Sequence, residues 1–150
     1  MKRFSLPFIG LSLYAQTLQL PREVVKISGS EAVLKLTLSA ADKKLTAMQW
    51  DIIIPAEQTL ETHNLGAAGR SAEKVLQCAG DARVGGKVHT YRCILAGGLK
   101  PIPSGDVAEL RFKIRRDAGP IKIRIDHAKG VTADLKATDF ASSEGTIVVR

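Results

Sequence analysis

The stretch AELRFKIR, residues 108–115, alternates strictly between apolar and charged side chains. One parity holds Ala108, Leu110, Phe112 and Ile114, and the other holds Glu109, Arg111, Lys113 and Arg115. Successive side chains of a strand point to opposite faces, so this period of two predicts a half-buried β-strand. The apolar face of such a strand needs a second layer to cover it, which favours a sheet packed on another sheet.

The same period recurs on both sides of this stretch. Residues 32–38 alternate with leucines on the apolar face, and residues 121–126 alternate with isoleucines. Further strands are predicted at 24–27, 47–54, 75–78, 91–95 and 146–149, the last of them after a turn at 143–145. The one helical signal is a single turn at 71–75. Eight or nine short strands of this kind predict an all-β fold, a β-sandwich of two antiparallel sheets.

One parity of these strands forms the predicted core. Its main members are Leu34, Leu36, Trp50, Ile52, Leu110, Phe112, Ile114, Ile123 and Val148. Trp50 is the only tryptophan and has two interpretations, a platform on which a sugar ring stacks or a core side chain. Apolar neighbours at every second position share its face, which favours the core.

The first fifteen residues have the layout of a secretory signal. Lys2 and Arg3 precede an apolar run from 4 to 13, and Ala15 is a small residue at which a peptidase can cut. The apolar run is half of the ~20 residues that span a bilayer, so a membrane anchor is not expected. The alternative is an uncleaved apolar strand. We therefore expect a signal peptide at 1–15 and one domain at 16–150, located outside the cell, in the periplasm or in the cell envelope.

Export would also place the two cysteines in an oxidising compartment. Cys78 and Cys93 are the only ones in the chain, and an even number in an oxidising compartment predicts a disulfide. If Gly85-Gly86 forms a two-residue hairpin loop, the cysteines are equidistant from it and lie opposite each other on antiparallel strands. A longer loop would remove this coincidence without excluding the disulfide.

The chain carries a moderate positive charge. Without residues 1–15 it has 20 basic and 15 acidic residues. Basic side chains form outward rows on two successive predicted strands: Arg111, Lys113, Arg115, Lys122 and Arg124. If both strands lie in one sheet, the rows form a positive patch for an acidic partner or an anionic glycan. The alternative is an ordinary solvated surface.

The strand at 47–54 presents a candidate partner surface. Its even-numbered residues are apolar and predict the core side, which leaves Ala47, Gln49, Asp51 and Ile53 on the outer face. Ile53 is an apolar residue on an otherwise polar face, and exposed apolar groups mark interfaces. The alternative is that a loop or a terminus covers this face.

Four segments together resemble the cohesin family of secreted bacterial proteins. They are LTAMQWDI at 45–52, GAA at 66–68 followed by KVLQC at 74–78, YRCILAGGL at 91–99, and IPSGDVAELRF at 102–112. In order and spacing they cover residues 24–150. The resemblance implies a nine-stranded jelly-roll sandwich that docks a small helical module, the dockerin, in the assembly of polysaccharide-degrading machinery.

The resemblance also implies what this chain does not carry. Cohesins are not enzymes, and the calcium of the complex belongs to the dockerin, so neither a cofactor nor a metal is expected here. Dockerin-binding cohesins often present Asn and Asp on the outer face of the third strand, whereas this sequence has Ala47 and Gln49 at those positions. The same superfamily includes carbohydrate-binding modules, which are the alternative function.

Catalytic and metal motifs are weak in the sequence. His63, His89 and His127 are widely spread and form no nucleophile–base or metal-ligand spacing. Glu57 and Glu61 follow Pro55 in a predicted loop without the marks of a catalytic pair. Three aspartates, Asp126, Asp134 and Asp139, have the oxygen ligands that calcium favours, but their spacing fits no calcium-binding loop. Nucleic acid is not expected, since no aromatic residues interleave the basic ones.

The sequence therefore favours a non-catalytic secreted module that binds a protein through a strand face. A carbohydrate-binding module would need an exposed row of aromatic rings. A small hydrolase would need a pocket in which two titratable groups converge.

Overall fold

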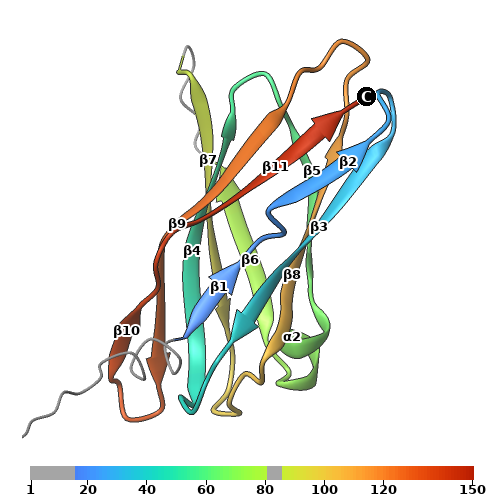
Figure 1. The fold of residues 1–150 in the computed structure, drawn as a ribbon. Coiled ribbons are helices and arrows are strands. Elements are labelled where there is room, and N and C mark those ends of the chain that lie inside the picture. Colours follow the sequence, from blue (N-terminus) through green and yellow to red (C-terminus); the bar gives the residue numbers. More distant parts are fainter. Residues whose placement is uncertain (1–15, 81–85) are drawn as a thin grey trace, which may run out of the picture.

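The computed structural model describes residues 16–80 and 86–150 and shows two sheets packed face to face (Figure 1). The four-stranded sheet contains, in spatial order, β1 (Thr17–Gln19), β3 (Glu31–Ser39), β8 (Gly105–Lys113) and β5 (Leu60–Leu65). The seven-stranded sheet runs β2 (Glu23–Lys26), β11 (Ser143–Val149), β9 (Ile121–Thr132), β4 (Leu45–Pro55), β7 (Val88–Ala96) and β6 (Val75–Gly80), with β10 (Ala137–Asp139) beside β9. The predicted all-β two-sheet sandwich is confirmed. The predicted signal peptide and most of the β6–β7 loop lie outside the described residues.

The pairing is antiparallel throughout the described strands except between β2 and β11, which run parallel. The prediction of purely antiparallel sheets is therefore wrong at this edge. The chain leaves β1 in one sheet and continues through Pro21 into β2 of the other. Gly145 permits the crossing, because a Cβ atom there would lie 2.5 Å from the Pro21 carbonyl oxygen. Residues 143–145, predicted as a turn, consequently belong to β11.

The predicted core is confirmed with one exception. Eight of the nine residues named above are buried, Trp50 and Phe112 completely. Val148 is instead half-buried and lies on the outer side, opposite Val25 of β2. Its neighbour Ile147 takes the core position, since it pairs with the buried Ile121 of β9.

Eleven strands stand where the resemblance implied nine. Two of the additional strands, β1 and β10, contain three residues each. The sequence pattern also misses β5, whose residues LETHNL bury only Leu60. This strand is at the edge of its sheet, where both sides tolerate polar groups and no alternation develops.

The predicted helical turn at 71–75 is misplaced. The helix α2 is Ala67–Ser71, between β5 and β6. It cannot continue, because Glu73 has a φ of +58° and β6 begins at Val75. Lys74, between the two elements, is buried and donates from Nζ to the carbonyl oxygen of Gly97 at 2.8 Å. Burial lowers the pKa of its amine. This contact ties α2 to the β7–β8 connection.

Candidate functional site

The four predicted surface residues lie in the middle of the seven-stranded sheet. Ala47, Gln49, Asp51 and Ile53 point away from the core, and β4 has β9 on one side and β7 on the other. We call the outward side chains of β9, β4, β7 and β6 the β4 face. Ala47, Gln49 and Ile53 are half-buried there. Asp51 is only 4% exposed, so the prediction that it lies open on the surface is wrong.

The side chains of Arg92 and His127 cover the carboxylate of Asp51. Arg92 of β7 donates from Nε to Oδ1 at 2.8 Å and from Nη2 to Oδ2 at 3.0 Å. Nδ1 of His127, from β9, lies 3.0 Å from the same Oδ2. The Arg92 and His127 side chains are themselves 59% and 64% exposed. Asp51 is therefore a buried carboxylate that holds two surface side chains in place.

A β-bulge brings His127 to this position. The β4–β9 register shifts between Gln49 and Asp51, so that Asp126 and His127 both face outward. His127 has a φ of +52°, a conformation that is uncommon for a residue other than glycine. Its backbone N–H donates to Oδ1 of Asp126 at 2.9 Å. Bulges re-aim side chains in this way, and here the bulge aims the imidazole at Asp51.

The electrostatics of the cluster favour the ionised carboxylate. The hydrogen bond from Arg92 holds the pKa of Asp51 below its ordinary value of 3.8, against the effect of burial, and His127 contributes in the same direction. The same pair raises the pKa of Arg92. A buried carboxylate with a bidentate guanidinium partner is among the stronger ion pairs in proteins.

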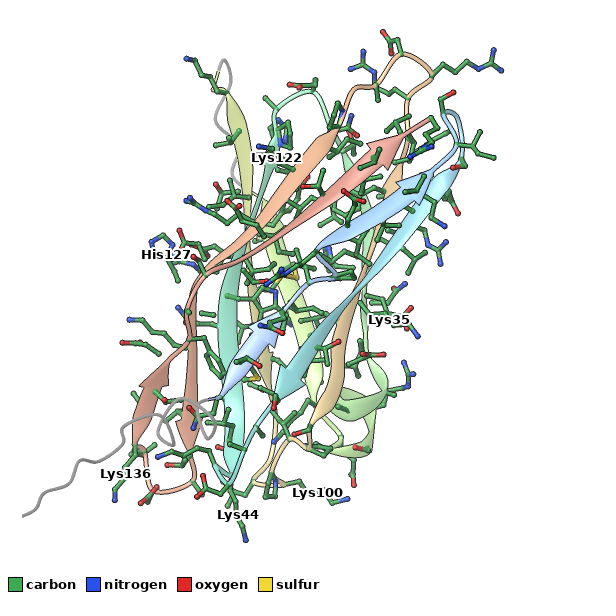
Figure 2. All side chains as sticks on the ribbon, viewed as in Figure 1. Lys35, Lys44, Lys100, Lys122, His127 and Lys136 are labelled. Atoms are coloured by element: carbon green, nitrogen blue, oxygen red, sulfur yellow. A yellow bond between two sulfur atoms is a disulfide. The ribbon has the colours of Figure 1, made fainter. Side chains whose placement is uncertain are left out.

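Two shallow hollows flank the Asp51 cluster along β4. The Ile94 hollow is lined by Ala47, Gln49, Ile94, Lys129 and Val131. The Ile53 hollow is lined by Ile53, Val88, Thr90, Lys122 and Arg124, among others. Each hollow thus combines aliphatic side chains with at least one basic side chain from β9. In Figure 2 Lys122 and His127 mark this side of the sandwich, and Lys35 marks the opposite side.

Seven large apolar side chains are exposed among the described residues, and three of them lie on the β4 face. The other four are Val25 in β2 and, outside the strands, Ile27, Leu99 and Leu135. Ile94 is 48% exposed, and Val75 and Val88 are exposed at least as much. Their register places all three on the outward parity of β6 and β7. The described strands of the four-stranded sheet contain no exposed large apolar side chain. Sequence reasoning found Ile53 but missed Ile94 and Arg92, although both have the parity opposite to the buried Cys93.

The predicted disulfide is present in the structure. Cys78 and Cys93 are directly opposed on β6 and β7, with a Cα–Cα distance of 4.0 Å. Cys93 is completely buried and lies opposite Trp50 in the β4–β7 register. The bond therefore fastens the edge of the seven-stranded sheet from its inner side, beneath Ile94 and Arg92.

The two predicted basic rows do not form one patch. Arg111 and Lys113 belong to β8 in the four-stranded sheet, whereas Lys122 and Arg124 belong to β9 in the seven-stranded sheet. The condition on which the patch depended, a shared sheet, is not met. Arg115 follows β8 and pairs with Asp117.

The candidate calcium ligands are also separate. Asp126 pairs with Arg124 at 3.0 Å, Asp134 lies close to Lys136 and the hydroxyl of Thr132, and Asp139 is in β10. Within residues 16–80 and 86–150, no group of three or more His, Cys, Asp or Glu side chains is arranged to hold a metal ion.

Two observations bear on catalysis. Glu57 and Glu61 line one hollow together with Lys113 and Arg115, but both carboxylates are exposed to solvent. Glu61 lies in β5, not in the predicted loop. His127 and Asp51 form the imidazole–carboxylate half of a hydrolytic triad, which the sequence did not reveal. In the described part of the chain, no hydroxyl or thiol is hydrogen-bonded to this imidazole.

The described aromatic residues are not arranged as a sugar-binding row. Trp50, Phe112 and Phe140 are buried, and Tyr91 is half-buried against the core. Stacking on a sugar ring needs an exposed aromatic face. No helix among the described residues has the length and apolar character needed to cross a membrane.

No family model matches the chain, and no curated protein matches its sequence. Solved structures do match. A non-cellulosomal cohesin from Archaeoglobus fulgidus has a TM-score of 0.70 at 13% identity, with 90% of this chain and 91% of that chain covered. A type I cohesin–dockerin complex from Clostridium thermocellum gives 0.72 at 12% identity, with 90% and 99% covered. A type III cohesin from a cell-surface anchoring scaffoldin of Ruminococcus flavefaciens gives 0.64 at 14% identity, with 97% and 93% covered.

At these identities the likeness shows the fold. The chain has a cohesin-type β-sandwich fold, so the fold class that the resemblance implied is confirmed.

Proposed function

We propose that this domain is a non-catalytic binding module of cohesin type that docks a protein partner on its β4 face. The observation that carries the proposal is that, among the described strands, every exposed large apolar side chain lies in the seven-stranded sheet, three of the four on the β4 face. Ile94, Val75 and Val88 lie on this face, and the described strands of the other sheet expose no large apolar residue. Apolar side chains exposed together on a folded domain mark interaction sites.

The face also has the rigidity that a docking surface needs. Its side chains project from strands in fixed register, and the Cys78–Cys93 disulfide fastens its edge. Binding to a preorganised surface loses little conformational entropy, so more of the contact energy appears as affinity. Catalysis, by comparison, needs acid–base groups shielded from water, and the carboxylates that share a hollow here are exposed.

The cohesin-type fold supports a partner outside the cell. Several matched structures are complexes of a cohesin with a dockerin, including one from Clostridium thermocellum and one from Acetivibrio cellulolyticus. We extend this to the present chain as an attachment or assembly function among secreted or cell-envelope components. A role in polysaccharide degradation belongs to the same proposal.

Affinity capture from the native secretome tests the proposal. The bait is the domain itself, and the test variant is Ile94→Asp, which places a charge in an apolar hollow. The matched control is Val33→Asp, on the outward side of β3 in the other sheet. We expect a saturable protein partner for the unmodified domain and for the control, and at least about tenfold weaker capture by Ile94→Asp. Equal capture by both variants would place the interface elsewhere.

A further inference from the structure

The centre of the β4 face has a feature that a merely apolar docking surface does not need. A buried carboxylate, Asp51, holds the Arg92 guanidinium by the edge formed by Nε and Nη2. A guanidinium is planar and has a second donor edge at its far end, formed by Nη1 and Nη2. Arg92 remains 59% exposed, so solvent or a partner can reach it. The arginine is therefore fixed in direction while it keeps unused donors.

His127 completes the support. Its Nδ1 lies 3.0 Å from Asp51 Oδ2, the oxygen that also accepts from Arg92 Nη2. The carboxylate is thus enclosed by Arg92 on the β7 side and His127 on the β9 side. Because Asp51 is saturated by these neighbours, it is unavailable to a partner, and the groups presented to solvent are the guanidinium and the imidazole.

The charges around this centre point to an anionic group on the partner. Lys129 and Lys122 face outward on β9, and neither has an ion-pair partner among the described residues. Arg124 is paired with Asp126, and Glu144 of β11 lies opposite Arg124. On the outward side of β9, β4 and β7, cations therefore outnumber carboxylates, and the two carboxylates there, Asp51 and Asp126, are already paired.

Resting on the proposed function, we propose that Arg92, mounted on Asp51 and braced by His127, is the receptor for a side-chain carboxylate of the protein partner. The carboxylate accepts two hydrogen bonds from the free edge of the guanidinium, the geometry that arginine favours with carboxylates. Aliphatic side chains of the partner fill the Ile94 and Ile53 hollows on either side. Asp51 is a positioning residue in this arrangement.

The fold fixes the spacing of these three contacts. Residues 47–49 of β4 line one hollow and residues 53–55 line the other, so the middles of the hollows are six residues apart, about 20 Å, and Asp51 lies midway between them. A helix covers that distance in about 14 residues, so aliphatic and acidic groups about 7 residues apart lie on one helical face. The matching partner element presents an aliphatic, an acidic and an aliphatic side chain in that order.

A peptide titration of the full domain tests this assignment. The probe is a blocked helical peptide in which two leucines, about 14 residues apart, flank one glutamate, and its control has glutamine in place of the glutamate. Calorimetry should show the glutamate peptide binding about tenfold more tightly than the glutamine peptide, as a charged hydrogen-bonded pair provides. Equal affinities, or no binding of either peptide, would overturn the carboxylate receptor.

Asp51→Asn separates positioning from simple electrostatics. The substitution makes the face more positive, so general charge attraction predicts tighter binding of the glutamate peptide. Our proposal predicts the opposite, a loss of most of the glutamate preference, because Arg92 is no longer held. The matched control Glu31→Gln makes the same charge change beside Arg111 on the other sheet and should leave the preference unchanged. Tighter binding by Asp51→Asn would refute the positioning role.

The two proposals fail in different ways. If Ile94→Asp leaves partner capture intact, the β4 face is not the interface and the proposed function is wrong. If Ile94→Asp abolishes capture but the glutamate and glutamine peptides bind alike, the face is the interface and only the carboxylate receptor is wrong.

Discussion

The two outer faces of this sandwich are built from the same alternating pattern and have different surfaces. The four-stranded sheet presents charged residues that pair with each other in solvent, such as Arg111 with Glu31 at 2.9 Å and Lys35 with Asp106 at 3.7 Å. The seven-stranded sheet presents aliphatic side chains and an ion pair whose carboxylate, Asp51, is buried. Exposed ion pairs contribute little to stability, whereas a buried one restricts the direction of its partner.

The difference between the two faces indicates which of them can give specificity for a binding partner. A face of exposed charged residues, such as that of β3 and β8, favours solubility in general and tolerates substitution. On the β4 face the sequence retains apolar residues that solubility alone would not favour, together with an arginine in a fixed direction. The comparison therefore identifies the seven-stranded sheet as the candidate interface without reference to any relative.

Among the described residues, only the seven-stranded sheet contains a disulfide, and loss of this bond should destabilise the domain more than any substitution considered below. Reduction of Cys78–Cys93 opens a loop with a sequence separation of 15 residues. We expect the free energy of unfolding to fall by about 3 kcal/mol, because the unfolded chain regains its loop entropy. Urea unfolding with and without reductant measures this. An unchanged midpoint would show that the disulfide does not stabilise the β6–β7 edge.

The second effect concerns the buried carboxylate. Asp51→Asn should lower the free energy of unfolding by about 1–3 kcal/mol, because Arg92 loses its charged partner. The folded-state pKa of Asp51 is held below 3.8, so its contribution is fully present above that value and is lost as the pH falls through the folded pKa. The difference between the two proteins should therefore be constant near neutrality and shrink below about pH 4. A difference that grows in acid would contradict the ion pair.

The smallest effect is expected on the opposite face. Arg111 donates from Nη1 to Oε1 of Glu31 at 2.9 Å, but this carboxylate is in solvent. We expect Glu31→Gln to leave the urea midpoint within experimental error. If Glu31→Gln destabilised the domain as much as Asp51→Asn, the proposed difference in stability between the ion pairs of the two faces would be wrong.

The alternating pattern predicted most of the fold because strand periodicity is a local property of the sequence. It placed Trp50 and Phe112 in the core. The opposition of Cys78 and Cys93 followed instead from a hairpin loop assumed at Gly85-Gly86, midway between them in the sequence. The alternating pattern failed for β5, an edge strand that buries one residue, and for Val148, whose parity is set by pairing with strands distant in sequence.

The candidate site was predictable only in part. Alternation indicated which side of β4 faces outward, and so it identified Ala47, Gln49 and Ile53. The burial of Asp51 depends on the β4–β7 register, which brings Arg92 from 41 residues away, and on the bulge that turns His127 outward. Neither the register nor the bulge is encoded in a local pattern, so both had to come from the structure.

Site-specific photo-crosslinking in the native secretome shows which of the two sheets contacts a protein partner. A photoreactive amino acid replaces Ile94 on the β4 face in one protein and Val33 on the four-stranded sheet in another. Irradiation should attach a partner protein to the position of Ile94 and leave the position of Val33 unmodified. A partner attached at Val33, or in equal yield at both positions, would contradict the assignment of the seven-stranded sheet as the binding surface.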